Sequence, residues 1–346
     1  MLIFDKVSHS YGKQRALDDL SFECASGQIT CLIGPSGCGK TTALRLAAGL
    51  LPLQSGTITL DGDVLAGPEG ERPPERRPVG MVFQEGALFP HLTVAGNVAY
   101  GLPREGRAER IVTLLERVGL ADFADRYPDS LSGGQRQRVA LARALGPQPR
   151  ALLFDEPYAN LDIQLRRRLR DDARRMIADS GKVGVFVTHD PEEVAAIADH
   201  VVVLDHGRIV QQGAPQSLYD APESLHVAQL FGDSQTVAGV LEGPTLTTPF
   251  GAWSRDCLID PSIADGEVTT VLRPHQLTLE VVEQGARVEE VQAAGRCERV
   301  WVLAQGAESR ILVELQPGAS PPAGACVRLE PAPGTVFATG SQDSAE

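Results

Sequence analysis

The residues of this sequence that are best suited to chemistry begin with a glycine-rich segment at positions 34–41. It fits the pattern G-x-x-x-x-G-K-[ST], follows the apolar run 29–33 and precedes a helix-prone stretch at 42–48. In a strand, loop and helix of this kind, glycines let the backbone approach phosphate groups closely, and the loop N–H groups and helix N-terminus carry partial positive charge. The segment therefore predicts a nucleotide phosphate site.

Two side chains at the end of this segment supply a charge and a metal ligand. Lys40 is expected to neutralise the β- and γ-phosphate oxygens, and Thr41 to place its hydroxyl on Mg²⁺. A glycine-rich turn that ends in a solvated lysine is the simpler alternative, but the flanking strand and helix disfavour it. The residues predicted to contact the nucleotide here are Gly34, Pro35, Ser36, Gly37, Cys38, Gly39, Lys40, Thr41 and Thr42.

A pair of acidic residues follows a second apolar run, at positions 151–154. Because ligands of open α/β sheets bind at the carboxyl ends of the strands, Asp155 is expected at the sheet edge where the phosphates bind. Asp155 is predicted to hold Mg²⁺ directly or through water, and Glu156 to accept a proton from the attacking water or to orient it. Two surface acids after a core strand are the alternative interpretation.

Length and composition limit the class of protein. A chain of 346 residues exceeds the usual size of one hydrophobic core, so two domains are expected. The formal net charge of −13 argues against a nucleic-acid partner held by a basic surface.

The first residues lack a basic stretch followed by an apolar core, and no apolar run approaches the roughly 20 residues needed to cross a bilayer, so a cytoplasmic chain is expected. The six cysteines show no C-x-x-C or metal-ligand spacing, which favours a reduced protein with buried thiols.

The chain changes character twice along its length. Five apolar runs predict buried strands of a parallel sheet, because several are continuous rather than alternating. These runs are 29–33, 79–83, 151–154, 183–187 and 201–204. Residues 86–145 have apolar positions at helical spacing and predict a helical subdomain inserted into this sheet. From residue 232, valine-rich segments separated by glycine- and proline-bearing turns predict a small all-β barrel. The predicted fold is therefore α/β for residues 1–231, followed by an all-β domain at 232–346.

A second motif, Leu-Ser-Gly-Gly-Gln, opens residues 131–145. With this motif and the features above in the same order, the chain resembles the ATP-binding-cassette (ABC) ATPases over residues 1–231. The resemblance implies a P-loop NTPase core of RecA-like type that binds ATP and Mg²⁺. The family roles that it implies are adenine stacking for Tyr11, contact with Mg²⁺ and sensing of the γ-phosphate for Gln84, Walker B acids for Asp155 and Glu156, the D-loop for Leu161 and Asp162, and the switch histidine for His189. Glu156, His189 and Gln84 are thus the expected catalytic residues.

In the family's arrangement the Leu-Ser-Gly-Gly-Gln motif does not reach a phosphate held by its own chain. The resemblance therefore implies that Ser132, Gly133, Gly134 and Gln135 contact the nucleotide of a second copy, and that a homodimer sandwiches two ATP molecules. A helix N-cap with a flexible lead-in is the alternative role of the serine, and the two roles are compatible. Ala159 stands where the family's D-loop commonly has serine, so the hydroxyl found there in the family is missing.

Longer segments resemble one branch of the family, the ATPases of bacterial importers that work with a periplasmic binding protein. The segments that carry this similarity are 73–84 and 88–94, together with 272–279, which resembles the Arg-Pro element of the accessory barrel in those importers. Within the branch, residues 84–94, 97–102 and 164–170 are most similar to the ferric-iron type. The resemblance thus favours import of ferric iron, with sulfate, polyamine, thiamine and sugar as alternatives.

The same resemblance implies the partners and the location. It implies integral membrane permease subunits, a solute-binding protein as an indirect partner, and a peripheral position on the cytoplasmic face of the cell membrane. The barrel resembles OB-type folds, but its acidic balance disfavours nucleic acid, so a regulatory or dimer-stabilising role is expected. A soluble ABC ATPase acting on DNA or ribosomes is disfavoured by the lack of sustained heptads, and a P-loop kinase by the motif at 131–135.

Overall fold

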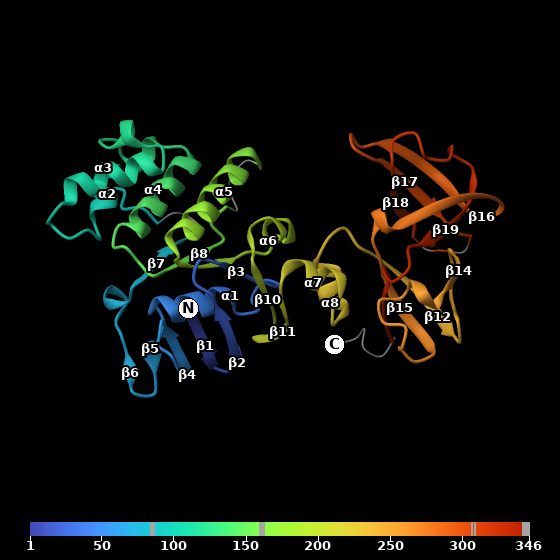
Figure 1. Ribbon diagram of the computed structural model, residues 1–346, viewed down its shortest axis with the longest axis horizontal. Helices are drawn as coiled ribbons and strands as arrows, with labels where there is room; N and C mark the ends of the chain where they lie inside the picture. The colour runs from blue at the N-terminus through green and yellow to red at the C-terminus, as the bar shows by residue number, and fades with distance from the viewer. Residues whose placement is uncertain (84–86, 159–162, 306, 308, 341–346) are drawn as a thin grey trace. The chain divides into compact units, whose positions relative to one another are not determined.

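We describe the protein from a computed structural model (Figure 1). The structure describes residues 1–83, 87–158, 163–305, 307 and 309–340, without the side chain of Leu165. The chain forms two compact units, Met1–Pro215 and Gln216–Glu346. Among the described residues, no helix is both long enough and apolar enough to cross a membrane.

A six-stranded sheet forms the centre of the first unit. Its strands lie in the order β11-β10-β3-β9-β8-β7, and all neighbouring pairs are parallel except β10 and β11. Every residue of β3, β8 and β9 is buried, which explains why these strands read as continuous apolar runs. The strands are β3 (Ile29–Ile33), β7 (Val79–Val82), β8 (Ala151–Asp155), β9 (Val183–Val187), β10 (His200–Asp205) and β11 (Arg208–Gly213). The predicted parallel sheet is confirmed.

The order of the central strands brings three chain segments to one edge of this sheet. Strand β3 lies beside β9, and β9 lies beside β8. In this register Leu32 is paired with Val187, and Val187 with Asp155. The strands therefore end level with one another. The glycine-rich loop after β3, the acidic pair at the end of β8 and the turn after β9 all begin at this edge, as the sequence predicts.

Helices α1 (Lys40–Ala48), α5 (Ile163–Ser180) and α6 (Pro191–Ile197) follow β3, β8 and β9 respectively. A second sheet, which is antiparallel, packs with α1 and was not predicted from the sequence. Its strands, in the order β2-β1-β4-β5-β6, are β1 (Leu2–Tyr11), β2 (Gln14–Cys24), β4 (Ser55–Leu60), β5 (Asp63–Gly67) and β6 (Gly70–Glu71).

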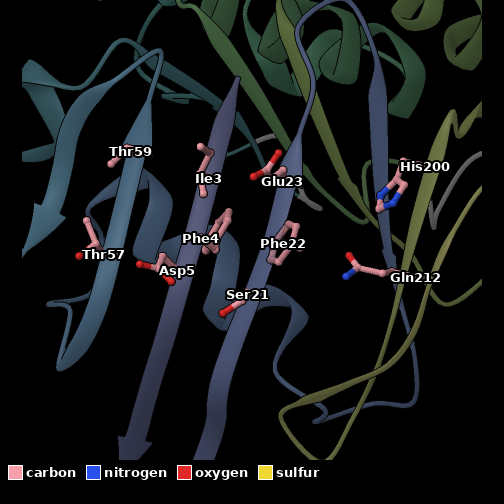
Figure 2. Close-up of a pocket in the computed structure, with 10 residues that line it drawn as sticks. All are labelled: Ile3, Phe4, Asp5, Ser21, Phe22, Glu23, Thr57, Thr59, His200 and Gln212. Atoms are coloured by element: carbon pink, nitrogen blue, oxygen red, sulfur yellow. The ribbon is translucent and has the colours of Figure 1, made fainter.

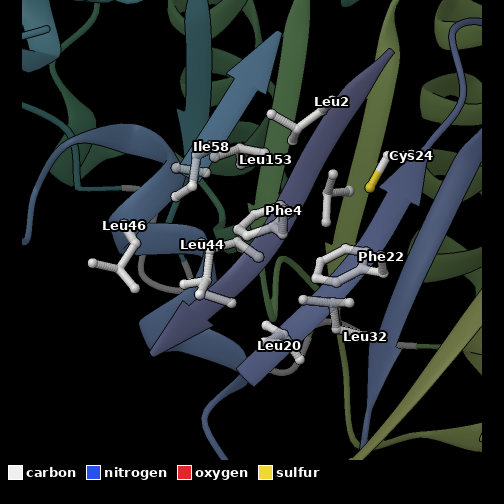
Figure 3. Close-up of a cluster of buried hydrophobic side chains, with 14 of the residues drawn as sticks. Leu2, Phe4, Leu20, Phe22, Cys24, Leu32, Leu44, Leu46, Ile58 and Leu153 are labelled. Atoms are coloured by element: carbon white, nitrogen blue, oxygen red, sulfur yellow. The ribbon is translucent and has the colours of Figure 1, made fainter. Parts of the chain in front are cut away.

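One hydrophobic core joins the antiparallel sheet to α1 and the parallel sheet (Figure 3). The rings of Phe4 and Phe22 stack with their centroids 4.4 Å apart, and they pack in the same cluster as Leu44 and Leu46 of α1 and Leu153 of β8. Offset aromatic stacking of this kind adds about 1 kcal/mol to the burial of the rings. The core therefore supports the helix that carries the end of the glycine-rich segment.

The helical segment predicted between the strands is present. Helices α2 (Val94–Ala99), α3 (Arg107–Arg117) and α4 (Gly133–Leu145) contact one another, and α4 also contacts β7 of the parallel sheet (Figure 1). The buried amide of Asn97 accepts a hydrogen bond from the Phe89 N–H and donates to the carbonyl oxygens of Phe89, Leu92 and Thr93. This amide therefore fixes the loop before α2, which has few backbone bonds of its own.

The second unit contains two short helices and two antiparallel sheets around one core. Helix α8 (Leu225–Leu230) contacts β15 and β20. The chain divides into compact units before this helix, between residues 215 and 216. The domain boundary at 231/232 stays a prediction. The all-β character predicted for the region after residue 232 is confirmed. The remaining elements are α7 (Pro215–Asp220), β12 (Gln235–Glu242), β13 (Thr245–Thr248), β14 (Gly251–Ser254), β15 (Gly266–Leu272), β16 (Leu277–Ala293), β17 (Glu298–Leu303), β18 (Ile311–Leu315), β19 (Cys326–Pro331) and β20 (Phe337–Gly340).

The six cysteines are all free thiols, in agreement with the reduced protein predicted. Cys24, Cys31, Cys38 and Cys257 are buried, and burial raises the pKa of the Cys24 thiol to about 12. A thiol of this kind reacts poorly, because the thiolate is the reactive form.

Candidate functional site

The glycine-rich loop is pressed against β2 on one side and open on the other. At Gly39, which has a φ of 108°, an added Cβ atom would lie 2.4 Å from the Ala16 carbonyl oxygen. At Gly37, which has a φ of 85°, an added Cβ atom would have no heavy atom within 4 Å. Only glycine adopts both conformations easily. The loop is therefore fixed on the side of the protein and leaves space next to Gly37.

Lys40 lies beneath this loop with only 6 % of its surface exposed. Its Nζ donates hydrogen bonds to the carbonyl oxygens of Gly34 at 2.7 Å and Pro35 at 2.8 Å, and lies 3.7 Å from Cys38 Sγ. Burial raises the pKa of the Cys38 thiol, and the positive charge of Lys40 partly opposes that rise. The ammonium group thus places a positive charge inside the loop, where phosphate oxygens would be neutralised.

A hydroxyl and a carboxylate meet at the start of α1. Thr41 Oγ1 donates a hydrogen bond of 2.9 Å to Asp155 Oδ1, which joins α1 to the end of β8. Burial raises the pKa of the Asp155 carboxyl, while the hydrogen bond from Thr41 lowers it. Mg²⁺ prefers oxygen ligands and commonly takes only one or two from protein. The two predicted metal ligands are therefore adjacent and fit that ion.

Glu156 and His189 come from neighbouring strands and lie side by side. Glu156 has a φ of 43°, in the left-handed region, and its backbone N–H donates to the Val187 carbonyl oxygen at 3.1 Å. His189 Nδ1 lies 3.4 Å from Glu156 Oε1, and 62 % of the histidine side chain is exposed. A non-glycine residue in the left-handed region costs free energy and is often found at functional sites. The structure therefore brings the predicted base and the predicted switch histidine together.

Tyr11 ends β1 and lies beside the first turn of α1. Its hydroxyl is 3.5 Å from Thr42 Oγ1, and its ring meets the edge of the His9 ring with the centroids 4.9 Å apart. Tyr11 is 47 % exposed. An aromatic ring here has the apolar surface that a base needs for stacking.

Ser132 caps helix α4. Its Oγ accepts a hydrogen bond from the Gln135 N–H at 3.3 Å, and the Ser132 N–H donates to Gln135 Oε1 at 2.8 Å. These two bonds form a capping box, so the N-cap role considered from the sequence is present. Gly133 and Gly134 form the first turn of this helix. Among the described residues, no hydrogen bond joins Ser132 or Gln135 to the loop at 34–41.

Two predicted elements lie outside the described residues. They are Gln84 and the D-loop segment with Ala159, Leu161 and Asp162. A separate hollow of about 880 Å³ lies over β1, β2 and β4, next to His200 and Gln212 (Figure 2). None of the predicted nucleotide-contacting residues lines it.

Four polar residues close to His189 were not predicted from the sequence to belong to the site. They are Arg166, Thr188, Asp190 and Glu193, which line one small cavity together with Glu156 and His189. A signal for one of them was available, because Asp followed by Pro is typical of a helix N-terminus and Asp190 caps α6. The others are recognised only from the tertiary structure.

Comparisons with known proteins agree with this geometry. A family model described as "ABC transporter" matches residues 17–159. The chain is 37 % identical over 322 residues to the Fe(3+) ions import ATP-binding protein FbpC of Pasteurella multocida, with 91 % of each chain covered. It is 40 % identical over 318 residues to the sulfate/thiosulfate import ATP-binding protein CysA of Gloeobacter violaceus, covering 90 % of this chain and 85 % of that one.

Solved structures show the same likeness over roughly two thirds of the chain. The ATP-binding cassette MJ0796, solved as a dimer in a post-hydrolysis state bound to ADP and Pi, superposes with a TM-score of 0.55 at 28 % identity. That match covers 62 % of this chain and 99 % of the other. The protein cbiO1 of Clostridium perfringens, part of the ABC transporter complex cbiONQ, gives a TM-score of 0.57 at 29 % identity, covering 64 % of this chain and 91 % of the other.

Proposed function

The chain belongs to the ABC transporter family, and we propose that it is the ATP-hydrolysing subunit of an importer whose cargo is ferric iron. The single observation that carries the import function is similarity along almost the whole chain to ATP-binding proteins of importers. Relatives from Pasteurella multocida and Rhodococcus jostii are named for Fe(3+) import, at 37 % and 43 % identity. Sulfate is the second candidate cargo, because a sulfate/thiosulfate relative matches at 40 % identity.

The phosphate end of ATP is proposed to bind on the open side of the glycine-rich loop. The Lys40 ammonium group is bonded to carbonyl oxygens of this loop, and a lysine has three donors, so it can bond to phosphate oxygens while it keeps a bond to the loop. Tyr11 is proposed to stack on the adenine ring. Thr41 and Asp155 are proposed to hold Mg²⁺, which would offset the negative charge of the phosphates.

Hydrolysis is proposed to depend on the pair formed by Glu156 and His189. Glu156 would accept the proton that a water molecule loses when its oxygen attacks the γ-phosphorus, as the bond to the ADP oxygen breaks. His189 would donate a hydrogen bond to the γ-phosphate. The 3.4 Å separation of their side chains supports roles at one reacting centre. Gln84 is proposed, on the family's pattern alone, to contact Mg²⁺ and report the γ-phosphate.

The active unit is proposed to be a homodimer with two ATP molecules between the chains. Ser132 is exposed, and the N-terminus of α4 presents partial positive charge that suits a phosphate of the second copy. Gly133, Gly134 and Gln135 would contribute the rest of this contact. MJ0796 was solved as a dimer, which supports the proposal.

Membrane permease subunits are proposed to dock on the helical segment, which would place the chain at the cytoplasmic face of the membrane. Tyr100 is 67 % exposed, and its ring centroid is 4.4 Å from that of Phe89. The Arg143 guanidinium lies 5.4 Å from the Phe89 ring. Phe89 and Arg143 are half-buried, so Tyr100 is the exposed member of this group. Aromatic and arginine side chains are enriched where proteins bind one another. These residues therefore suit a surface that passes movement to a partner.

The second domain, residues 232–346, is proposed to regulate the ATPase or stabilise its dimer. The Arg-Pro element has a structural role in the second compact unit, Gln216–Glu346. Arg273 is only 2 % exposed, its guanidinium lies 3.7 Å from the Tyr219 ring centroid, and it donates to the Tyr219 carbonyl oxygen at 3.0 Å. It therefore anchors α7 to the end of β15.

The proposed cargo is tested by uptake of labelled ferric iron and labelled sulfate in the same cultures, with and without the gene. We expect loss of iron uptake alone, restored by the wild-type gene and not by the Glu156→Gln form. Loss of sulfate uptake alone would overturn the iron assignment and keep the importer. Unchanged uptake of both solutes, with the protein expressed, would contradict both assignments.

A further inference from the structure

The chain immediately before His189 is fixed on several sides. Thr188 is 4 % exposed, and its backbone N–H donates to the Leu32 carbonyl oxygen at 3.2 Å. Its hydroxyl donates to Glu193 Oε2 at 2.6 Å and accepts from the Asp190 N–H at 3.0 Å. The backbone on the N-terminal side of the histidine is therefore tied both to β3 and to α6.

Two carboxylates hold the chain on the other side of the histidine. Asp190 caps α6, because its Oδ1 accepts from the Glu192 N–H at 2.9 Å. Glu193 lies on α6 with 9 % of its surface exposed, and burial raises its pKa while the bond from Thr188 opposes that rise. A buried carboxylate destabilises a fold unless it is hydrogen-bonded and paired with a positive charge. Glu193 therefore needs a cation nearby.

Arg166, on the first turns of α5, supplies that cation to both carboxylates. Its Nη1 lies 3.4 Å from Asp190 Oδ2, and its Nε lies 3.8 Å from Glu193 Oε1. The side chain of Arg166 is 27 % exposed, and those of Asp190 and Glu193 are 29 % and 11 % exposed, so these contacts are only partly screened by solvent. One arginine thus connects α5 to the residue after His189 and to the helix that follows it.

The His189 side chain has a different environment from its backbone. Its imidazole is 62 % exposed and lies next to Glu156, whereas the surrounding turn is held by Thr188, Asp190 and Glu193. These residues and Arg166 together line a cavity of about 70 Å³. When the backbone of a residue is already fixed, its side chain loses less conformational freedom on contact with a substrate.

We infer that Arg166 and Glu193 are positioning residues which hold the His189 turn in place and make its position depend on the first turns of α5. The inference rests on the role proposed above for His189. A shift of α5 would move Arg166, and through Asp190 and Glu193 it would move the turn that carries the imidazole. Both residues act through the turn, because Arg166 contacts Asp190 and Glu193, and Glu193 accepts the hydrogen bond of Thr188.

The test measures kcat, KM and the Kd for ATP of the full-length protein with Arg166→Gln, Glu193→Gln and the double variant. Arg167→Gln is the matched control, because Arg167 is an exposed neighbour on the same helix. We expect each single variant to lower kcat about ten-fold, with KM and Kd changed by less than about two-fold. The double variant should lose no more than either single variant, since the two residues act as a unit. Arg166→Lys, which keeps the charge, should recover part of the loss.

Several results would overturn this inference. An Arg166→Gln protein with wild-type kcat would do so, and so would losses that multiply to about a hundred-fold in the double variant. A thermal unfolding midpoint that falls in parallel with kcat would point to stability alone. The role of His189 is tested separately by His189→Ala. Full turnover in that variant, with slow turnover in Arg166→Gln, would reject action through His189 and leave the ATPase assignment intact.

Discussion

Glu156 Oε1 lies 3.4 Å from His189 Nδ1, although the two residues follow different strands of the parallel sheet. The contact arises because β8 and β9 are neighbours in register, with Asp155 paired with Val187. Each residue then needs only one or two further positions to reach the edge where the strands end. The sheet order therefore brings the proposed hydrolytic pair together.

Replacing Glu156 with Gln should abolish turnover and preserve ATP binding. The amide keeps the size of the side chain but cannot accept the proton of the attacking water, and general bases contribute about 10²- to 10⁴-fold to such rates. Phosphate release and equilibrium binding of ATP, measured on one preparation, check this expectation. Turnover near the wild-type rate would remove Glu156 as the base.

Two glycines of the phosphate loop should respond differently to alanine. Gly39→Ala should destabilise the protein by at least about 3 kcal/mol, because its methyl group would collide with the Ala16 carbonyl oxygen. Gly37→Ala should cost only about 1–2 kcal/mol, the usual cost of a side chain in the left-handed region, yet weaken ATP binding strongly.

Gly181→Ala is the control for this pair. Gly181 also has a positive φ, of 62°, and open space around its missing Cβ, but it lies before β9, at the opposite end from the proposed site. It should lose similar stability without any change in ATP affinity. Equal ATP affinities for Gly37→Ala and wild type would contradict phosphate binding on the open side of the loop.

Asp155 should make the nucleotide-free protein less stable at neutral pH. Burial raises the pKa of the Asp155 carboxyl in the folded protein above its value in the unfolded chain. The carboxyl therefore contributes stability at pH values below the unfolded pKa, and this contribution is lost as the pH rises through the folded pKa. Asp155→Asn should therefore raise the thermal unfolding midpoint at neutral pH. The gain should shrink on acidification toward about pH 4, the ordinary carboxyl range.

Asp63→Asn is a control of opposite sign. Hydrogen bonding from Arg150, with the charge of Arg72, lowers the pKa of Asp63, so its contribution is present at neutral pH and lost on acidification. Removing that carboxylate should lower the midpoint slightly at neutral pH, because the group is exposed. A stability gain for Asp155→Asn that grows on acidification would contradict the assigned cause.

Ser132 can be tested for a role beyond helix capping. Asn caps helices about as well as Ser, so Ser132→Asn should keep stability within about 0.5 kcal/mol, whereas Ser132→Ala should lose about 1 kcal/mol. Both should reduce turnover, because neither presents a hydroxyl to a nucleotide. Calorimetric unfolding and phosphate release separate the two effects. Wild-type turnover in Ser132→Asn would leave the serine with its capping role alone.

The parallel strands and the phosphate loop were predictable because their signals are local. Strands β3, β8 and β9 are buried on both faces, so their residues form continuous apolar runs. The antiparallel sheet was missed because β1 has register shifts against both neighbours, and Lys6 within it has a φ of 50°. Such bulges interrupt the alternation by which an antiparallel strand is recognised.

The proposed site was predictable to the extent that it follows strand ends. Asp155 and Glu156 follow one buried run directly, and His189 follows another. The contacts of Arg166 with Asp190 and Glu193 were not predictable, since they join α5 to the cap and first turn of the next helix, across the intervening strand β9. Most charged side chains on helices are solvent-exposed, so only packing distinguishes these from the rest.

The most direct test of the account is the mass of Glu156→Gln, measured by light scattering in solution with Mg²⁺ and either ATP or ADP. We expect more dimer with ATP than with ADP, because hydrolysis is blocked and each ATP bridges the loop at 34–41 of one copy to Ser132 of the other. The same protein carrying Ser132→Asn should form less dimer at equal ATP occupancy. A monomer at saturating ATP would contradict the shared nucleotide site, and so would an ATP-bound dimer that Ser132→Asn leaves unchanged.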